Sequence, residues 1–191
     1  MRTLLPALCL LLPAAPPPLF VDGTADSGIV FHHRSSKTAM KYLPETMGGG
    51  VAILDVDQDG WMDVFFVNSA ALQVGRRDAD PLEKTGPEFF NRLYRNLGKG
   101  RFEDVTERYR VGGHGYGMGA ATGDYNNDGF PDLLVTNYNS LILYRNDAGR
   151  RFTDVTAAAR LTQAEGWMTS AGFLDYDNDG DLDLFVARYL A

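Results

Sequence analysis

Carboxylates recur at a fixed spacing in three short segments of the chain, and this spacing is typical of a metal site. The segments begin at Asp55, Asp124 and Asp175 and read DVDQDGWMD, DYNNDGFPD and DYDNDGDLD. Each places oxygen-bearing side chains at positions 1, 3, 5 and 9, and glycine at position 6. Because so many like charges repel one another unless a cation lies among them, the sequence predicts bound metal. A hard cation that takes about six to eight oxygen ligands in flexible geometry fits best, which favours Ca²⁺ over Mg²⁺.

The predicted ligands are the side chains at positions 1, 3, 5 and 9 and the main-chain carbonyl at position 7, with water completing the shell. The expected cofactor is Ca²⁺ at two or three sites. Acidic hairpin turns without metal are the alternative, because Asp, Asn and Gly are ordinary turn residues. Three copies in the same register favour metal. The predicted metal ligands are Asp55, Asp57, Asp59, Trp61, Asp63, Asp124, Asn126, Asp128, Phe130, Asp132, Asp175, Asp177, Asp179, Asp181 and Asp183.

The residues around these acidic loops predict strands and exclude an EF-hand. An EF-hand needs Glu at position 12 and a helix on each side, but position 12 is Phe66, Val135 and Val186. The flanking apolar runs are too brief for helices and are rich in β-prone residues. We therefore expect each acidic loop to join two strands.

The acidic loops belong to a repeat of about 50 residues. Leu-Tyr-Arg-Asn occurs at 93–96 and 143–146, and Phe-x-Asp-Val-Thr occurs at 102–106 and 152–156. With the two strands around each loop, these motifs give four strands per unit, which is typical of a β-propeller blade. The predicted fold is all-β, a partial β-propeller over 19–191 with calcium loops between the first two strands of each blade. The expected blades cover about 47–110, 111–160 and, incompletely, 161–191.

Three segments depart from the repeat. Residues 69–88 form an insertion that we expect to be an exposed loop, and residues 32–46 are expected to be a further surface insertion. Phe20–Thr24 matches the fourth-strand motif and is interpreted as a stray outer strand that completes the last blade of a closed ring. A propeller needs about 4–8 blades, so the remaining blades are expected from sequence beyond Ala191.

The first residues have the pattern of a secretory signal peptide. Arg2 is followed by an apolar run over 4–15 that is too short to span a bilayer. We expect a signal peptide over 1–18 and a secreted protein, extracellular or periplasmic, without a membrane span. Cys9 is the single cysteine and lies in this segment. The mature chain would then have no disulfide, and bound metal would stabilise it instead.

Together these motifs resemble the FG-GAP/VCBS repeat proteins, and more narrowly the cartilage-acidic-protein-like group with an ASPIC/UnbV region. The resemblance is carried by the acidic loops, by the two strand motifs, and by segments 45–52 and 115–120. It covers essentially all of the chain after the signal segment. It implies an exported, calcium-binding, integrin-α-like propeller. Asn126 at position 3 and Pro131 at position 8 of the second loop depart from the other two loops, and no ASPIC/UnbV region occurs in this sequence.

Other functional classes find little support. The net charge is −7 and no basic stripe occurs, so no nucleic-acid partner is expected. Residues 115–120 fit a loose G-x-G-x-x-A, but a metal loop follows where that motif needs a helix, so an inner strand is the better interpretation. We expect the aromatic residues, including Trp61 and Trp167, to pack between blades, and Tyr176 at position 2 of the third loop to pack locally. A sugar-binding aromatic platform is the alternative.

The leading functional prediction is a secreted calcium-binding β-propeller segment for adhesion or for binding an unknown protein or glycan, with structural calcium and no catalysis of its own. The alternative is an exported propeller enzyme that acts on polysaccharide as a lyase or hydrolase. His32, His33 and His114 are its candidate groups, but none is paired with a nucleophile in a recognisable motif. A third hypothesis is a scaffold whose partner binds the 69–88 insertion.

Overall fold

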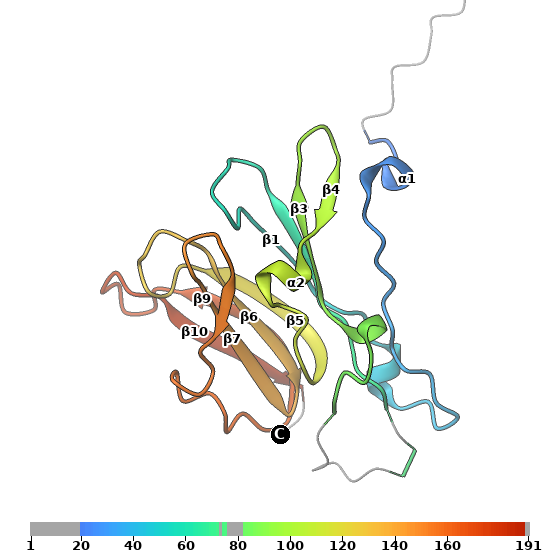
Figure 1. Ribbon diagram of the computed structural model, residues 1–191. Helices are drawn as coiled ribbons and strands as arrows, with labels where there is room; N and C mark the ends of the chain where they lie inside the picture. The colour runs from blue at the N-terminus through green and yellow to red at the C-terminus, as the bar shows by residue number, and fades with distance from the viewer. Residues whose placement is uncertain (1–19, 73, 76–81, 190–191) are drawn as a thin grey trace, which may run out of the picture.

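The fold is all-β and consists of two antiparallel sheets (Figure 1). A computed structural model describes residues 20–72, 74–75 and 82–189. The predicted signal peptide at 1–18 and the middle of the 69–88 insertion lie outside the described residues. Within them, no helix has the length and hydrophobicity needed to cross a bilayer. The helical turns are α1 (Thr24–Ser27), η1 (Leu43–Thr46), η2 (Pro87–Phe89) and α2 (Thr106–Tyr109).

The first sheet contains four strands in chain order. Its strands are β1 (Val51–Leu54), β2 (Asp63–Phe66), β3 (Arg92–Asn96) and β4 (Phe102–Asp104). β1 alternates in burial, because Val51 and Ile53 are exposed while Ala52 and Leu54 are buried. The last residue of β1, Leu54, lies opposite Asp63 on β2. The first acidic loop therefore joins two antiparallel strands, as predicted.

The second sheet contains the remaining strands. They are β5 (Tyr116–Gly123), β6 (Asp132–Tyr138), β7 (Ser140–Asn146), β8 (Phe152–Asp154), β9 (Trp167–Leu174) and β10 (Asp183–Tyr189). β5 to β8 pair successively, β9 pairs with β10, and Tyr138 opposite Trp167 links the two groups. The second and third acidic loops join β5 to β6 and β9 to β10. Residues 132–137 of β6 are all buried, so this strand is covered on both faces.

The first strands of the three units pack against one another, and glycine permits their close approach. β1 contacts β5, and β5 contacts β9. A Cβ atom on Gly50 would lie 2.7 Å from the Cα of Gly119, and one on Gly119 would lie 2.7 Å from the carbonyl oxygen of Thr169. A continuous apolar core extends from the first sheet through α2 to β6 and β7, with Phe65 and Ile142 fully buried within it.

The stray outer strand predicted for Phe20–Thr24 is wrong. Phe20 lies in a bend, no strand includes these residues, and α1 begins at Thr24. The turn that follows the fourth strands is nevertheless reproduced. The backbone N–H of Thr24 donates to Asp22 Oδ1 over 3.0 Å, as that of Thr106 does to Asp104. The motif therefore encodes the turn, whereas a strand also needs a neighbouring strand to pair with.

The two predicted surface insertions are only partly exposed. Ser69, Ala70 and Leu82 are buried. Lys84 Nζ donates to the carbonyl oxygens of Asn68, Ser69 and Phe89 over 2.5, 2.8 and 2.8 Å, which ties the two ends of the 69–88 insertion together. His33 Nε2 lies 3.1 Å from Ser69 Oγ, so the 32–46 segment also contacts it. Buried main chain requires hydrogen-bond partners, and Lys84 supplies three.

The aromatic residues divide into two groups. Tyr94, Tyr116, Tyr144 and Trp167 are buried, as predicted. Trp61, which lies in the first acidic loop, is 52% exposed, so the prediction of packing between blades is wrong for this residue. Tyr176, for which position 2 of the third loop favours local packing instead, is 84% exposed.

Candidate metal centres

The three acidic loops share one backbone conformation. The first carboxylate of each loop accepts the N–H groups of positions 5 and 6; Asp55 accepts them from Asp59 over 3.1 Å and from Gly60 over 2.9 Å. Asp124 and Asp175 repeat both contacts. The glycines at position 6 have φ of 88, 92 and 94°, a backbone conformation that glycine adopts without steric cost. The carboxylate at position 1 thus holds each loop in a turn through two backbone hydrogen bonds.

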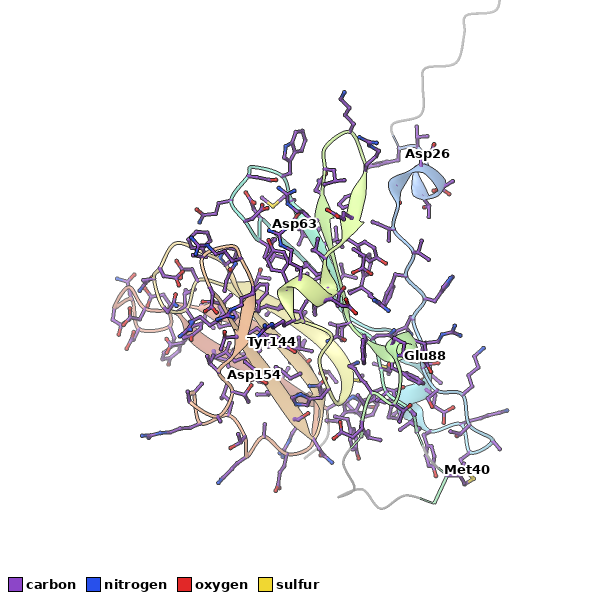
Figure 2. The ribbon with its side chains drawn as sticks, viewed as in Figure 1. Asp26, Met40, Asp63, Glu88, Tyr144 and Asp154 are labelled. Atoms are coloured by element: carbon purple, nitrogen blue, oxygen red, sulfur yellow. The ribbon has the colours of Figure 1, made fainter. Side chains whose placement is uncertain are left out.

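The carboxylate at position 9 ties the loop back to the sheet. Asp63 Oδ2 accepts the N–H of Val56 over 2.9 Å, and its Oδ1 accepts the N–H of Asn96 on β3 over 2.7 Å. Asp132 makes the same two contacts with Tyr125 and Asn146. Figure 2 shows Asp63 between the loop and the β3–β4 hairpin. The position-9 aspartate is therefore set at a fixed point, with lone pairs remaining for a cation.

Two of the loops gather three carboxylates each. One oxygen from each of Asp55, Asp57 and Asp63 lies within 4.8 Å of the others, and the same holds for Asp175, Asp177 and Asp183. Asp57 Oδ1 is buried and has no hydrogen-bond partner. A buried anionic oxygen without a partner is costly, and a bound cation would satisfy it. The donor set in the first loop therefore fits a hard cation such as Ca²⁺.

The other predicted ligands make different contacts. Asp59 and Asp179 lie outside these two groups and accept the N–H of position 7 through Oδ1 over 2.9 Å. Asp181 Oδ1 accepts a hydrogen bond from the neighbouring loop. In the second loop Asn126 replaces a carboxylate at position 3, and its amide donates to Asp128 over 2.9 Å. Carbonyl oxygens at position 7 belong to Trp61, Phe130 and Asp181 and would be added ligands.

Burial and like charge raise the pKa of two position-9 carboxylates, Asp63 and Asp132. Burial is the main cause for Asp63, and the nearby Asp57 and Asp59 add to it, while two backbone hydrogen bonds act in the opposite sense. For Asp132 the same balance, with burial first, raises the pKa to about 6. A nearby cation would stabilise the ionised form of a carboxylate whose pKa is raised in this way.

Sequence reasoning missed Arg95. This residue lies on β3, where its Nε contacts Asp57 Oδ2 and its Nη2 contacts Asp59 Oδ2, both at 2.6 Å. Its position in the repeated Leu-Tyr-Arg-Asn motif, next to the asparagine that holds Asp63, was the signal that could have pointed to it. Arg95 thus supplies a positive charge at the first metal centre.

The fourth residue of the loops was also missed. Gln58 and Asn127 occupy position 4 with φ of 58 and 57°. Gln58 Nε2 donates to the carbonyl oxygen of Gly129 in the second loop, and Asn127 Nδ2 donates to Asp181 Oδ1 in the third over 2.8 Å. Each of these two loops therefore contacts the next one along the chain, and the loops follow one another along one side of the molecule (Figure 1). A carboxamide recurring at position 4 was the sequence signal.

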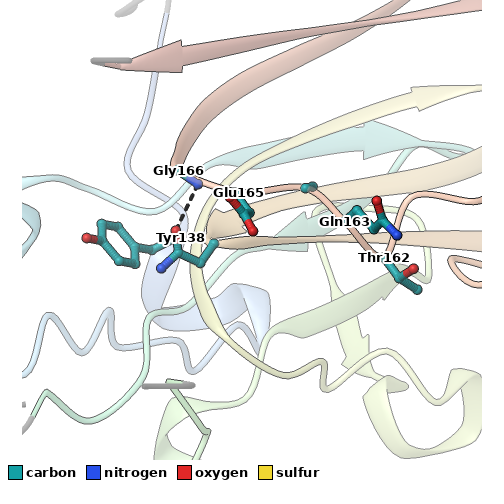
Figure 3. A pocket seen from close by; sticks show the side chains of 7 residues that line it. Tyr138, Thr162, Gln163, Glu165 and Gly166 are labelled. Atoms are coloured by element: carbon teal, nitrogen blue, oxygen red, sulfur yellow. Dashed lines mark hydrogen bonds between the residues drawn. The ribbon is translucent and has the colours of Figure 1, made fainter. Parts of the chain in front are cut away.

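A separate cavity of about 790 Å³ lies at the other end of the second sheet, lined by residues 138–139 and 162–166 (Figure 3). Gly166 N–H donates to Asn139 Oδ1 over 2.8 Å at its wall. None of the predicted ligands lines this cavity, so it is not part of the metal centres.

Comparison with known proteins identifies the family. A profile of the FG-GAP-like repeat matches residues 55–135 and 124–186, which include the three acidic loops. Cartilage acidic protein 1 of Xenopus tropicalis is 29% identical over 145 residues, which cover 73% of this chain and 19% of that protein. The chain thus spans about a fifth of the length of the curated relative that it matches. Both similarities confirm the resemblance drawn from the loop and strand motifs, and the chain belongs to the FG-GAP-like repeat proteins.

Proposed function

We propose that the three acidic loops bind Ca²⁺ and that the ion has a structural role. The observation that carries this proposal is the buried, unpartnered Asp57 Oδ1 beside Asp55 and Asp63. The side-chain oxygens at positions 1, 3, 5 and 9 and the carbonyl at position 7 would hold the ion. With dissociation constants on the order of 10⁻⁴–10⁻³ M and millimolar calcium, each site would stabilise the fold by about 0.4–1.4 kcal/mol.

Calorimetric titration of chelator-treated protein with Ca²⁺ tests this proposal. Binding heat and a calcium-dependent rise in melting temperature are expected. Asp57→Asn keeps the size of the side chain and removes one charge, so it should weaken the first site and leave the third unchanged. Asp26→Asn, an exposed residue remote from the loops in sequence, is the matched control. Absence of both heat and stabilisation in the unsubstituted protein would reject calcium binding.

The proposed architecture is a partial β-propeller over 19–191. Supporting it are the side-by-side packing of β1, β5 and β9 and the four-strand order of the first two units, from inner to outer strand. Blades would cover about 47–110, 111–160 and, incompletely, 161–191. Val51 and Ile53 on β1, and Phe185 on β10, are more than half exposed. In a closed ring such apolar faces would be covered by further blades.

The proposed role of the propeller is adhesion, or binding of a protein or glycan, by an exported protein with its signal peptide at 1–18. Family membership and the relation to cartilage acidic protein 1 support this role. The loops would give the binding surface a fixed shape, because each is held to its sheet and to its neighbour. Fusing the segment 1–18 to a reporter enzyme and assaying export tests the location. Retention of the reporter in the cytosol would contradict it.

Catalysis is not part of the proposal. His33 Nε2 contacts Ser69 Oγ at 3.1 Å, and burial lowers the pKa of His33. A serine nucleophile needs access to substrate, but Ser69 is 1% exposed. A screen of polysaccharides for reducing-end or unsaturated products provides the test. Activity lost in His33→Ala would favour the enzyme instead.

A further inference from the structure

Arg95 lies beside the carboxylates of the first acidic loop that are proposed to bind a cation. Its guanidinium contacts Oδ2 of both Asp57 and Asp59, the carboxylates at positions 3 and 5 of the first acidic loop, at 2.6 Å. All three side chains are mostly buried, between 18 and 27% exposed. Charge-assisted contacts of this length are the strong ones. Arg95 thus joins the first loop to β3 through two ion pairs.

The equivalent arginine in the second unit behaves differently. Arg145 lies 50 positions after Arg95 in the repeated motif. Its Nε and Nη2 contact Asp147 Oδ1 at 3.1 and 2.9 Å, not the carboxylates of the second loop. A hydrogen bond from Thr153, with Arg145 and Arg151, lowers the pKa of Asp147 to about 2. Asp147 is therefore ionised and holds Arg145 away from the second acidic loop.

Two differences in sequence accompany this change of partner. Position 3 of the second loop is Asn126, so that loop offers the arginine no carboxylate there. The position of Asp147 is occupied in the first unit by Leu97, which is 46% exposed and offers no charge. Arg95 consequently has no acidic partner on its own strand end. The nearest carboxylates that it contacts are those of the first loop.

We propose that Arg95 is a built-in competitor of Ca²⁺ at the first acidic loop, so that this site binds calcium more weakly than it would without the arginine, and that its contacts with Asp57 and Asp59 hold the loop to β3. This inference rests on the proposed calcium binding. A positive charge a few ångströms from a bound dication repels that dication. In a water-like dielectric, this repulsion lowers the affinity for the dication roughly tenfold.

Tryptophan at position 7 permits a test that reports on the first site alone. Tb³⁺ replaces Ca²⁺ in oxygen-ligand sites and emits light when a neighbouring tryptophan is excited. Trp61 lies in the first loop, and the second tryptophan, Trp167, begins β9 at the end away from the loops. Displacement of Tb³⁺ by Ca²⁺, followed through tryptophan excitation, therefore gives the calcium affinity of the first site.

Three variants separate competition from a purely structural role. Arg95→Met removes the charge and should tighten calcium binding at the first site about tenfold. Leu97→Asp keeps the arginine but offers it the partner that Asp147 provides in the second unit, so it should also tighten binding. Arg145→Met is the matched control and should leave the first site unchanged. Calcium-free Arg95→Met should show faster amide exchange at residues 57–60 than the unsubstituted protein.

The calcium affinities of these variants either support or overturn the proposed competition between Arg95 and Ca²⁺. Weaker or unchanged calcium affinity of the first site in both Arg95→Met and Leu97→Asp would overturn the inference, because Arg95 would then organise the ligands or have no influence on them. If Arg95→Met does not fold, Leu97→Asp alone gives the answer. Failure of the proposed calcium binding looks different, since calorimetry would then show no calcium heat in any variant.

Discussion

The side-chain amide of Asn127 lies 2.8 Å from Oδ1 of Asp181 and joins the second acidic loop to the third. Asn127 holds position 4 of its loop, and Asp181 holds position 7 of the next, where a main-chain carbonyl would bind the ion. The same amide is 3.5 Å from the carbonyl oxygen of Gly180. Neighbouring acidic loops therefore share a contact through which the order of one can affect the other.

Replacing Asn127 by Ala should weaken the third site. Loss of one hydrogen bond to a charged acceptor corresponds to about 1.5–3 kcal/mol when buried, and less for these exposed groups, so a twofold to fivefold loss of calcium affinity is expected. Calorimetric titration measures it. Asn178→Ala is the control, because Asn178 has the same position and φ of 60° but no loop follows it in the described residues. Equal losses in the two variants would contradict coupling between loops.

Gly119→Ala should destabilise the packing of β5 on β9. The added methyl group would meet the carbonyl oxygen of Thr169 at 2.7 Å and Thr136 Oγ1 at 2.8 Å. Overpacking of this kind costs about 1–3 kcal/mol. Gly172→Ala on β9 is the control, since a Cβ there would have no neighbour within 4 Å. Chemical denaturation of both variants measures the difference, and equal stability would argue against close packing of the inner strands.

Acidification should release calcium from the second loop. The pKa of Asp132 is raised to about 6, chiefly by burial, and a ligand must be deprotonated to bind metal. Calcium affinity at this site should therefore fall as pH drops through about 6. Calcium titrations between pH 5 and pH 7.5 provide the measurement. An affinity that is constant over this range would refute the role of Asp132.

In calcium-free protein, the effect of pH on the stability of the fold is opposite in sign to its effect on calcium affinity. A carboxyl whose folded-state pKa lies above its unfolded value stabilises the fold fully below the unfolded value of 3.8. That contribution is lost as pH rises through about 6. Calcium-free protein should thus lose part of its stability between these two values, and Asp132→Asn should remove this loss. Denaturant melts of both proteins in chelator test it.

Lys84→Met should destabilise the protein by about 1–3 kcal/mol, because the carbonyls of Asn68, Ser69 and Phe89 would lose their shared donor. Burial lowers the pKa of Lys84 to about 7, while these carbonyls favour the charged form. Lys37→Met, at an exposed position, is the control. Thermal melts compare them, and equal melting temperatures would show that the carbonyls find other partners.

The sequence predicted the elements that repeat and missed several contacts between them. The apolar runs around each acidic loop predicted strands, because brief β-prone segments cannot form stable helices, and β1, β2, β5, β6, β9 and β10 confirm this. Arg95 and Arg145 occupy equivalent positions in the repeated motif, so the sequence did not reveal that their side chains have different partners. Only the fold brings Arg95 beside Asp57, which lies 38 positions earlier.

Errors arose where local sequence was interpreted without its neighbours. Phe20–Thr24 matches a strand motif, but in the described residues its pairing strand is missing and the turn alone forms. Exposure of the 69–88 insertion was inferred from its charged residues. Lys84 is one of these, and its long side chain instead binds main-chain carbonyls.

The contacts made by the residues at position 4 give the row of acidic loops a direction. Gln58 donates from the first loop to the second, and Asn127 donates from the second to the third. Every such hydrogen bond therefore has a donor loop and an acceptor loop, and a row of these loops has two unlike ends. Asn178 holds the same position in the third loop. In a closed ring of such units, Asn178 would donate to a following loop and the first loop would accept from a preceding one.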